Sequence, residues 1–130
     1  MLDTAGMSDL LRYVQTPNGA VDGSEFGTVT TASGVETLFA MSAYHYVVDG
    51  TAYPAILLQT GSNDAIVEPS QVAKFAARLQ AATTSGKPVL LRVESGSGHP
   101  APSAGSASQQ RLADEWSFLL WQFGVAGFQP

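Results

Sequence analysis

Two short apolar runs, one either side of an amphipathic segment, constrain this chain most. The first run spans 55–60 (Ala-Ile-Leu-Leu-Gln-Thr) and lies between Pro54 and Gly61. The second spans 89–93 (Val-Leu-Leu-Arg-Val) and follows Pro88. Short apolar runs bounded by Pro and Gly indicate buried β-strands.

The segment between the two runs is predicted to be a helix. Pro69 is placed for its first turn and Gly86 for its end. Its apolar residues recur at i, i+3, i+4 and i+7, on one helical face: Val72, Phe75, Ala76 and Leu79. A second amphipathic helix closes the chain, marked by Leu112, Trp116, Leu119, Leu120 and Phe123. The order strand, helix, strand, helix predicts an α/β fold with a short parallel sheet flanked by helices.

The rest of the chain gives weaker local signals. Short helices are predicted at 8–13 and 35–41, whereas the Gly-, Thr- and Ser-rich stretch 19–34 and the segment 95–108 are expected to be loops. The 130 residues are expected to form one domain, 1–130.

Composition excludes several classes of function. The net charge is −5 and the six basic residues form no run, which argues against nucleic-acid binding. No stretch approaches the length needed to span a bilayer, so no membrane partner is expected. There is no cysteine, hence no disulfide or thiolate metal site. The first residues lack the pattern of a signal peptide, which favours the cytoplasm. Only 13% of residues are charged, so a partner could cover part of the surface.

Two residues that could perform chemistry follow the predicted strands. Asp64 comes directly after the first strand and His99 shortly after the second. In open parallel sheets, ligands bind beyond the carboxyl ends of the strands. An acid followed by a histidine also matches the last two members of the α/β-hydrolase order Ser, Asp, His. The carboxylate would orient the imidazole, which would act as the general base.

From spacing alone, other interpretations remain open. A histidine in a Gly-rich loop is more often solvated or structural than catalytic. Ser62 and Ser97 are expected to be turn or loop residues, and His45 to pack rather than to bind a ligand. A metal site from Asp64, Glu94 and His99 lacks the usual ligand spacing. The two tryptophans, Trp116 and Trp121, are expected to belong to the core or an interface.

Several motifs in order resemble the prolyl oligopeptidase family. They are 53–64 (Tyr-Pro-Ala-Ile-Leu-Leu-Gln-Thr-Gly-Ser-Asn-Asp), Val67-Glu68-Pro69, 86–93, Gly98-His99 and, earlier, 9–13, 25–28 and 44–47. The resemblance runs from about Asp9 to Phe123 and implies the C-terminal part of an α/β-hydrolase domain. It implies that Asp64 is the triad acid and His99 the triad base. It further implies cleavage of short peptides, typically after proline, beneath a β-propeller, with no cofactor or metal.

The chain departs from the family pattern at three points. The nucleophile motif G-x-S-x-G is absent, and the serine that the family places upstream would precede Met1. Ile66 stands where the family often has a substrate-gripping arginine, and Pro100 follows the histidine where glycine is usual. We therefore expect a C-terminal fragment of the catalytic domain that is inactive alone.

Two rival functions stay open at this point. One is a small non-catalytic protein-binding or assembly module that reuses the fold, and the other is a hydrolase completed by another chain. A peptide ligand is compatible with either. Self-association as a homodimer is also expected, because residues 1–8 are poor strand formers and would leave one edge of the 55–60 strand unpaired.

Overall fold

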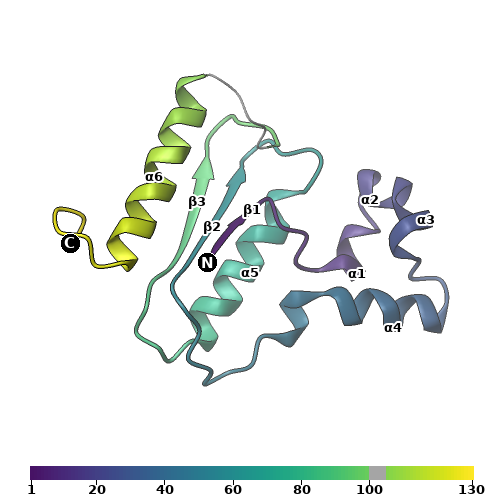
Figure 1. Cartoon of the computed structure of the whole chain (residues 1–130). Helices are drawn as coiled ribbons and strands as arrows, with labels where there is room; N and C mark the ends of the chain where they lie inside the picture. The colour runs from purple at the N-terminus through teal and green to yellow at the C-terminus, as the bar shows by residue number, and fades with distance from the viewer. Residues whose placement is uncertain (100–104) are drawn as a thin grey trace.

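The computed structural model describes residues 1–99 and 105–130. A three-stranded parallel sheet lies between two long helices, with a group of shorter helices to one side (Figure 1). The strands, in spatial order, are β1 (Leu2–Thr4), β2 (Ile56–Gly61) and β3 (Val89–Glu94). The helices are α1 (Leu10–Tyr13), α2 (Pro17–Val21), α3 (Gly23–Phe26), α4 (Ala32–Met41), the 3₁₀ helix η1 (Ala43–Tyr46), α5 (Pro69–Ala82) and α6 (Ser106–Gln122). The predicted α/β fold is confirmed.

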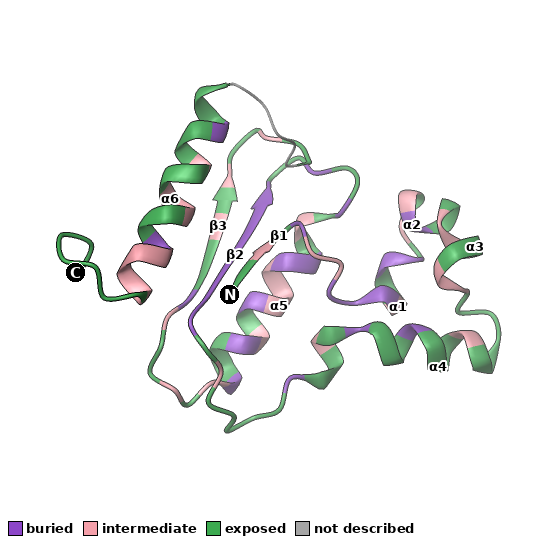
Figure 2. Ribbon diagram, in the orientation of Figure 1, coloured by how far each residue is buried: buried purple, intermediate pink, exposed green. Residues whose placement is uncertain are grey.

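The central strand β2 is buried along its whole length, as Figure 2 shows. Successive side chains of a strand point to opposite faces, so β2 contributes to two cores. Ile56 and Leu58 lie in a hydrophobic cluster with Val72 of α5. Leu57 lies on the other face, in a cluster with Phe118 of α6. A strand covered on both faces accounts for the continuous apolar run in its sequence.

A group of short helices, residues 8–47, forms a lobe beside the sheet that we call the helical lobe. Its core contains Leu10, Tyr13 and Leu38, and it also takes up Val67 from the segment between β2 and α5. The expectation of loop over 19–34 is wrong, because this stretch holds most of α2, all of α3 and the start of α4.

Threonine caps explain why that stretch is helical. The side chain of Thr16 accepts a hydrogen bond from the N–H of Gly19 at the start of α2, and Thr31 does the same for Gly34 at the start of α4. Threonine is common in loops, but these two threonines cap the N-termini of helices. The expectation of a loop over 95–108 is also wrong for its last three residues, because α6 begins at Ser106.

The N-terminal segment pairs with β2, which corrects the expectation of an unpaired edge there. Leu2 lies opposite Leu57 in a parallel register, and the N-terminal amino group donates a 2.7 Å hydrogen bond to the carbonyl oxygen of Ala55. The N–H of Ala5 donates to the carbonyl oxygen of Gln59 at 2.9 Å. Pairing with an already formed strand outweighs the low strand propensity of this segment. The edge strands of the described sheet are therefore β1 and β3.

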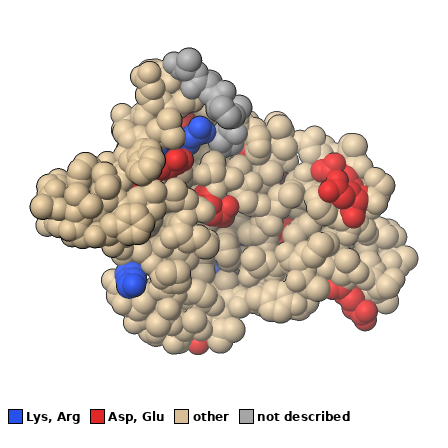
Figure 3. All heavy atoms as spheres, viewed as in Figure 1, with Lys and Arg blue, Asp and Glu red and all other residues tan. Residues whose placement is uncertain are grey.

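Charged side chains are sparse on the face seen in Figure 3, where wide uncharged areas separate a few acidic and basic groups. Within the described parts of the chain, no helix combines the length and the apolar character that crossing a membrane requires.

Candidate active site

The two predicted site residues meet at the carboxyl end of the sheet. Asp64 lies in the loop after β2, and His99 lies in the loop after β3. The Nδ1 atom of His99 is 2.8 Å from the Oδ2 atom of Asp64, within hydrogen-bonding distance. The predicted approach of these two side chains is confirmed. A carboxylate can only accept in this contact, so Nδ1 carries the proton.

The carboxylate of Asp64 is fully enclosed by protein. Its side chain is 0% exposed. Its second oxygen, Oδ1, accepts hydrogen bonds from the backbone N–H groups of Ile66 and Val67, at 2.9 and 3.0 Å. Burial of an unpaired carboxylate is costly, and these three contacts provide the partners that it requires. They also fix the direction in which Oδ2 faces the imidazole.

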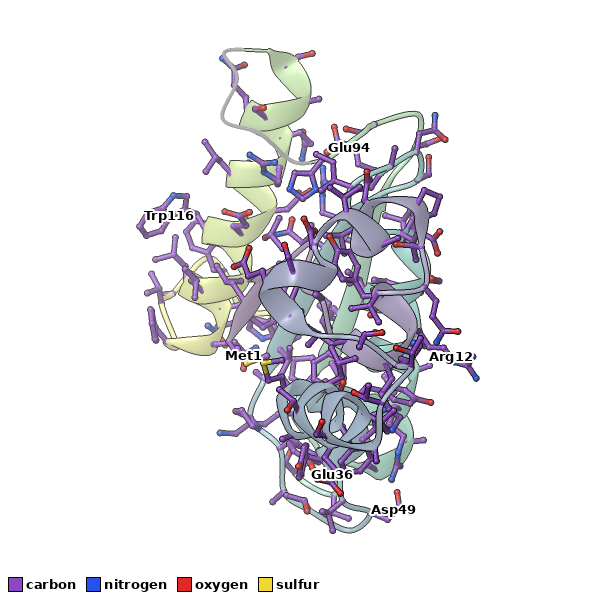
Figure 4. The ribbon with its side chains drawn as sticks, turned by 90° about the vertical axis from the view of Figure 1, so that its right-hand side faces the viewer. Met1, Arg12, Glu36, Asp49, Glu94 and Trp116 are labelled. Atoms are coloured by element: carbon purple, nitrogen blue, oxygen red, sulfur yellow. The ribbon has the colours of Figure 1, made fainter. Side chains whose placement is uncertain are left out.

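The two loops that carry the pair are joined to each other. The N–H of Asn63 donates to the carbonyl oxygen of Ser97, and the N–H of Gly96 donates to Oγ of Ser62, at 2.9 and 2.8 Å. The N–H of Ser62 donates to the carbonyl oxygen of Glu94, the last residue of β3, at 2.9 Å. Glu94 is labelled in Figure 4, near the end of the sheet at which the loops meet. The acid and histidine loops thus form one hydrogen-bonded unit.

Sequence reasoning missed the linking role of Ser62, which was expected only to help form a turn. The signal available was its place between the strand-ending Gly61 and the acid, where a short hydroxyl can bond a neighbouring backbone.

The imidazole of His99 is partly open to solvent, with 35% of its side chain exposed. Because Nδ1 donates to Asp64, Nε2 is the nitrogen that can take up a proton. A positioned histidine of this kind can act as a general base toward a hydroxyl and then as a general acid toward a leaving group. The arrangement is therefore chemically able to serve as the acid and base parts of a nucleophilic site.

Of the other residues considered from the sequence, His45 and Trp121 pack against neighbours, whereas Trp116 lies outside the core. His45 packs, as expected: its ring stacks on Phe39 with a 5.0 Å centroid distance and its Nε2 lies 3.3 Å from Oδ1 of Asp9. Trp121 packs edge-on against Phe118, whereas Trp116 is 60% exposed and points away from α6 (Figure 4).

Ile66 is half exposed beside Asp64, and Pro100 lies outside the described residues. In residues 1–99 and 105–130, no group of three or more His, Cys, Asp or Glu side chains is placed to hold a metal ion.

Comparison with known proteins matches this chain and its fold to one family. The family model described as the prolyl oligopeptidase family matches residues 1–126. The prolyl endopeptidase of Elizabethkingia miricola is 35% identical over 121 residues, which cover 92% of this chain and 17% of that protein. The prolyl endopeptidase of Dictyostelium discoideum is 32% identical over 119 residues, covering 88% and 15%.

Solved structures agree with the sequence relatives. One from a study of two prolyl endopeptidases is 32% identical with a TM-score of 0.75, and covers 94% of this chain and 17% of that chain. Oligopeptidase B from Leishmania major matches in fold, with a TM-score of 0.86 at 20% identity, covering 95% and 17%.

The parallel sheet, its flanking helices and the loops at its carboxyl end define part of an α/β-hydrolase catalytic domain. The chain belongs to the prolyl oligopeptidase family. It spans only 17% of the length of the Elizabethkingia relative, and the match falls in the catalytic part of such enzymes.

Proposed function

We propose that this chain supplies the acid, Asp64, and the base, His99, of a prolyl oligopeptidase-type serine peptidase. The nucleophilic serine and its oxyanion donors would come from polypeptide beyond these 130 residues, in the same protein or in another chain. The observation that carries the proposal is the 2.8 Å contact between Nδ1 of His99 and Oδ2 of the buried Asp64. A carboxylate held by backbone donors and directed at an imidazole is the support that a triad histidine needs.

The residues would take these roles in peptide cleavage. Nε2 of His99 would accept the proton of the serine hydroxyl as its oxygen attacks the peptide carbonyl carbon, and would then protonate the leaving amine. Asp64 would keep the imidazole in the required tautomer and stabilise the imidazolium, while remaining ionised itself. Proline-containing peptides are the proposed substrates, by analogy with relatives named prolyl endopeptidases.

The outer side of β1 offers a place for the additional polypeptide. β1 is a short edge strand whose register is set only by β2. Within the described residues, the outer side of β1 pairs with no other strand, which supports the proposal that further polypeptide pairs there.

The decisive test is a chimera. Residues 1–126 would replace the matching C-terminal part of the Elizabethkingia miricola prolyl endopeptidase, which supplies the missing segments. We expect hydrolysis of a proline-containing chromogenic peptide by the chimera, and no turnover by the 130-residue chain alone, because it lacks a nucleophile.

Variants of the chimera assign the roles. His99→Ala should lower kcat about 10⁶-fold and Asp64→Asn about 10⁴-fold, the losses seen when a triad base or acid is removed. The matched control is His45→Gln, which changes the other histidine of the chain and keeps a hydrogen-bond donor for Asp9. A folded, active chimera that tolerates His99→Ala would refute the proposal. A folded but inactive chimera would instead favour the protein-binding module.

A further inference from the structure

The loop that carries Asp64 is anchored at its far end in the helical lobe. Oδ1 of Asp64 is bonded to the N–H of Val67. The side chain of Val67 is 4% exposed and lies in the core of the helical lobe with Leu10 and Leu38. The position of the carboxylate therefore depends on a residue that packs away from the sheet.

Gln71, in the first turn of α5, extends this anchor. It is 1% exposed. Its side-chain Oε1 accepts the N–H of Asp9 at 2.9 Å, and its backbone carbonyl accepts the Oγ–H of Ser8 at 2.6 Å. Its own N–H donates to the carbonyl oxygen of Glu68 at 2.9 Å. One buried side chain thus joins the segment after the acid loop to the start of α1.

We propose that Gln71 is a positioning residue for the Asp64–His99 pair. It holds the segment 67–71 against α1, and that segment supplies a backbone N–H to Asp64. When the anchor is released, the carboxylate is free to turn away from the imidazole, and the hydrogen bond to Nδ1 weakens. The catalytic meaning of this role rests on the proposed function, whereas the structural coupling can be measured in the chain itself.

Ser42 provides a matched control for general loss of stability. It is 0% exposed, and its Oγ accepts the N–H of Leu10 at 2.9 Å and donates to the carbonyl of Leu38 at 2.7 Å. Gln71 and Ser42 therefore cap neighbouring N–H groups at the start of the same helix. Only Gln71 belongs to the segment that follows the acid loop.

The experiment compares Gln71→Met with Ser42→Ala in the full 130-residue chain. Each variant removes a buried acceptor, so each should lower global stability. NMR would follow the Nδ1 proton of His99, assigned with His45→Gln, and the amide exchange of Val67. We expect about fivefold faster exchange of both protons in Gln71→Met, the effect of one lost hydrogen bond. Ser42→Ala should speed both exchanges less than Gln71→Met does, because its hydroxyl bonds Leu10 and Leu38 and not the segment 67–71. Equal effects in the two variants, or no effect of Gln71→Met, would overturn the inference.

Two further outcomes keep the test decisive. If Gln71→Met does not fold, Gln71→Asn makes a smaller change in the same direction, because its shorter side chain cannot reach the N–H of Asp9. A wild-type spectrum without a hydrogen-bonded Nδ1 proton would contradict the proposed function itself. A normal wild-type pair that is insensitive to Gln71 would contradict only the positioning role.

Discussion

Gly61, at the end of β2, lies directly against the backbone carbonyl of Gly98 in the histidine loop. A Cβ atom on Gly61 would approach the carbonyl oxygens of Gly98 and Ser97 closer than non-bonded atoms can lie. Only glycine allows the strand that leads to the acid and the loop that carries the histidine to touch through their backbones. The Asp64–His99 contact therefore depends on the absence of a side chain three residues before the acid.

Gly61→Ala is predicted to separate the pair. The obstructing atoms belong to the backbone, so the histidine loop itself has to move. The 2.8 Å contact of His99 with Asp64 should then be lost, together with the Asn63–Ser97 hydrogen bond. We expect disappearance of the hydrogen-bonded Nδ1 proton signal and, in the chimera, a loss of activity approaching the roughly 10⁴-fold of an acid-deficient triad.

The control for this prediction is Gly23→Ala, because a Cβ at Gly23 meets nothing within 4 Å. This variant should keep the signal and should be neutral or slightly stabilising, since alanine favours the helix α3. A Gly61→Ala variant that retains the Nδ1 signal would show that the histidine loop can yield without losing the pair.

Asp9 is predicted to contribute to unfolding in acid. Burial alone would raise the pKa of its carboxyl group, but the hydrogen bond and charge of Lys74, the N–H of Arg12 and the nearby His45 together lower that pKa below its usual value. A group with a lowered folded-state pKa stabilises the protein above its unfolded pKa of about 3.9, and this stabilisation is lost as pH falls through the folded value. Asp9→Asn should be less stable at neutral pH and lose less stability below about pH 4.

Urea unfolding as a function of pH measures this effect. Asp49→Asn is the matched control, because Asp49 also pairs with a basic side chain, Arg78, but is 77% exposed. Exposed ion pairs contribute little, so this control should keep the acid slope of the wild type. If Asp9→Asn retains that slope in full, the acid sensitivity arises from other carboxyl groups.

Tyr13 is predicted to limit stability at alkaline pH. Burial and the hydrogen bond to Asp22, with the charges of Asp22 and Glu25, raise the pKa of its phenol to about 12. The unfolded phenol ionises near pH 10, so the folded state loses stability as pH rises from about 10 to 12. Tyr13→Phe should lose about 1 kcal/mol at pH 7, where the hydrogen bond is missing, and should show a shallower alkaline decline. Tyr46→Phe, at a 55% exposed site, should keep the steep decline.

The sequence predicted most of the sheet and the approach of Asp64 and His99, because these signals are local. The predicted runs 55–60 and 89–93 correspond to β2 and β3. Asp64 and His99 lie in the loops that follow the carboxyl ends of these strands, where they meet. Strand length, apolar character and flanking Pro or Gly are all visible in a short window. The place of a loop in a parallel sheet then follows from topology.

The remaining elements depended on contacts that are distant in sequence. β1 forms because it pairs with β2 more than 50 residues away, as the 54-residue separation of Met1 and Ala55 shows. The short helices of the lobe are stabilised by packing around Leu38 rather than by their own propensity. Gln71 and Gly61 took their roles from tertiary neighbours, which no local pattern reveals.

Self-association remains a proposal, and the structure changes the surface that would mediate it. β2 is paired on both sides, which leaves β1 and β3 as the edges of the described sheet, and β3 is the longer of the two, with six residues against three. The carbonyl oxygens of Pro88 and Glu94 accept hydrogen bonds from the β2 side. Residues alternate in direction along a strand, so the backbone groups of Leu91 and Val93 face away from β2.

The exposed edge of β3 lacks the usual protection against pairing. Leu91 and Val93 are 36% and 50% exposed, and neither is a charged residue or a proline. The one basic side chain of the strand, Arg92, is engaged with Asp114 of α6 at 2.7 Å. A second copy that pairs antiparallel about a two-fold axis would bond these outward groups and would cover the same residues on both copies.

We therefore predict a dimer of the isolated chain that pairs through β3. Light scattering should give twice the 13.6 kDa of one chain, with dissociation on dilution. Val93→Lys should shift the protein to monomer, because a charge at the edge opposes strand pairing. Val21→Lys removes an apolar side chain that is 78% exposed on α2, away from the edge, and should leave the dimer intact. In the dimer, the outward amides of Leu91 and Val93 should be protected from exchange. A mass of one chain at every concentration would refute the dimer, and a dimer with unprotected amides at both positions would refute the β3 interface.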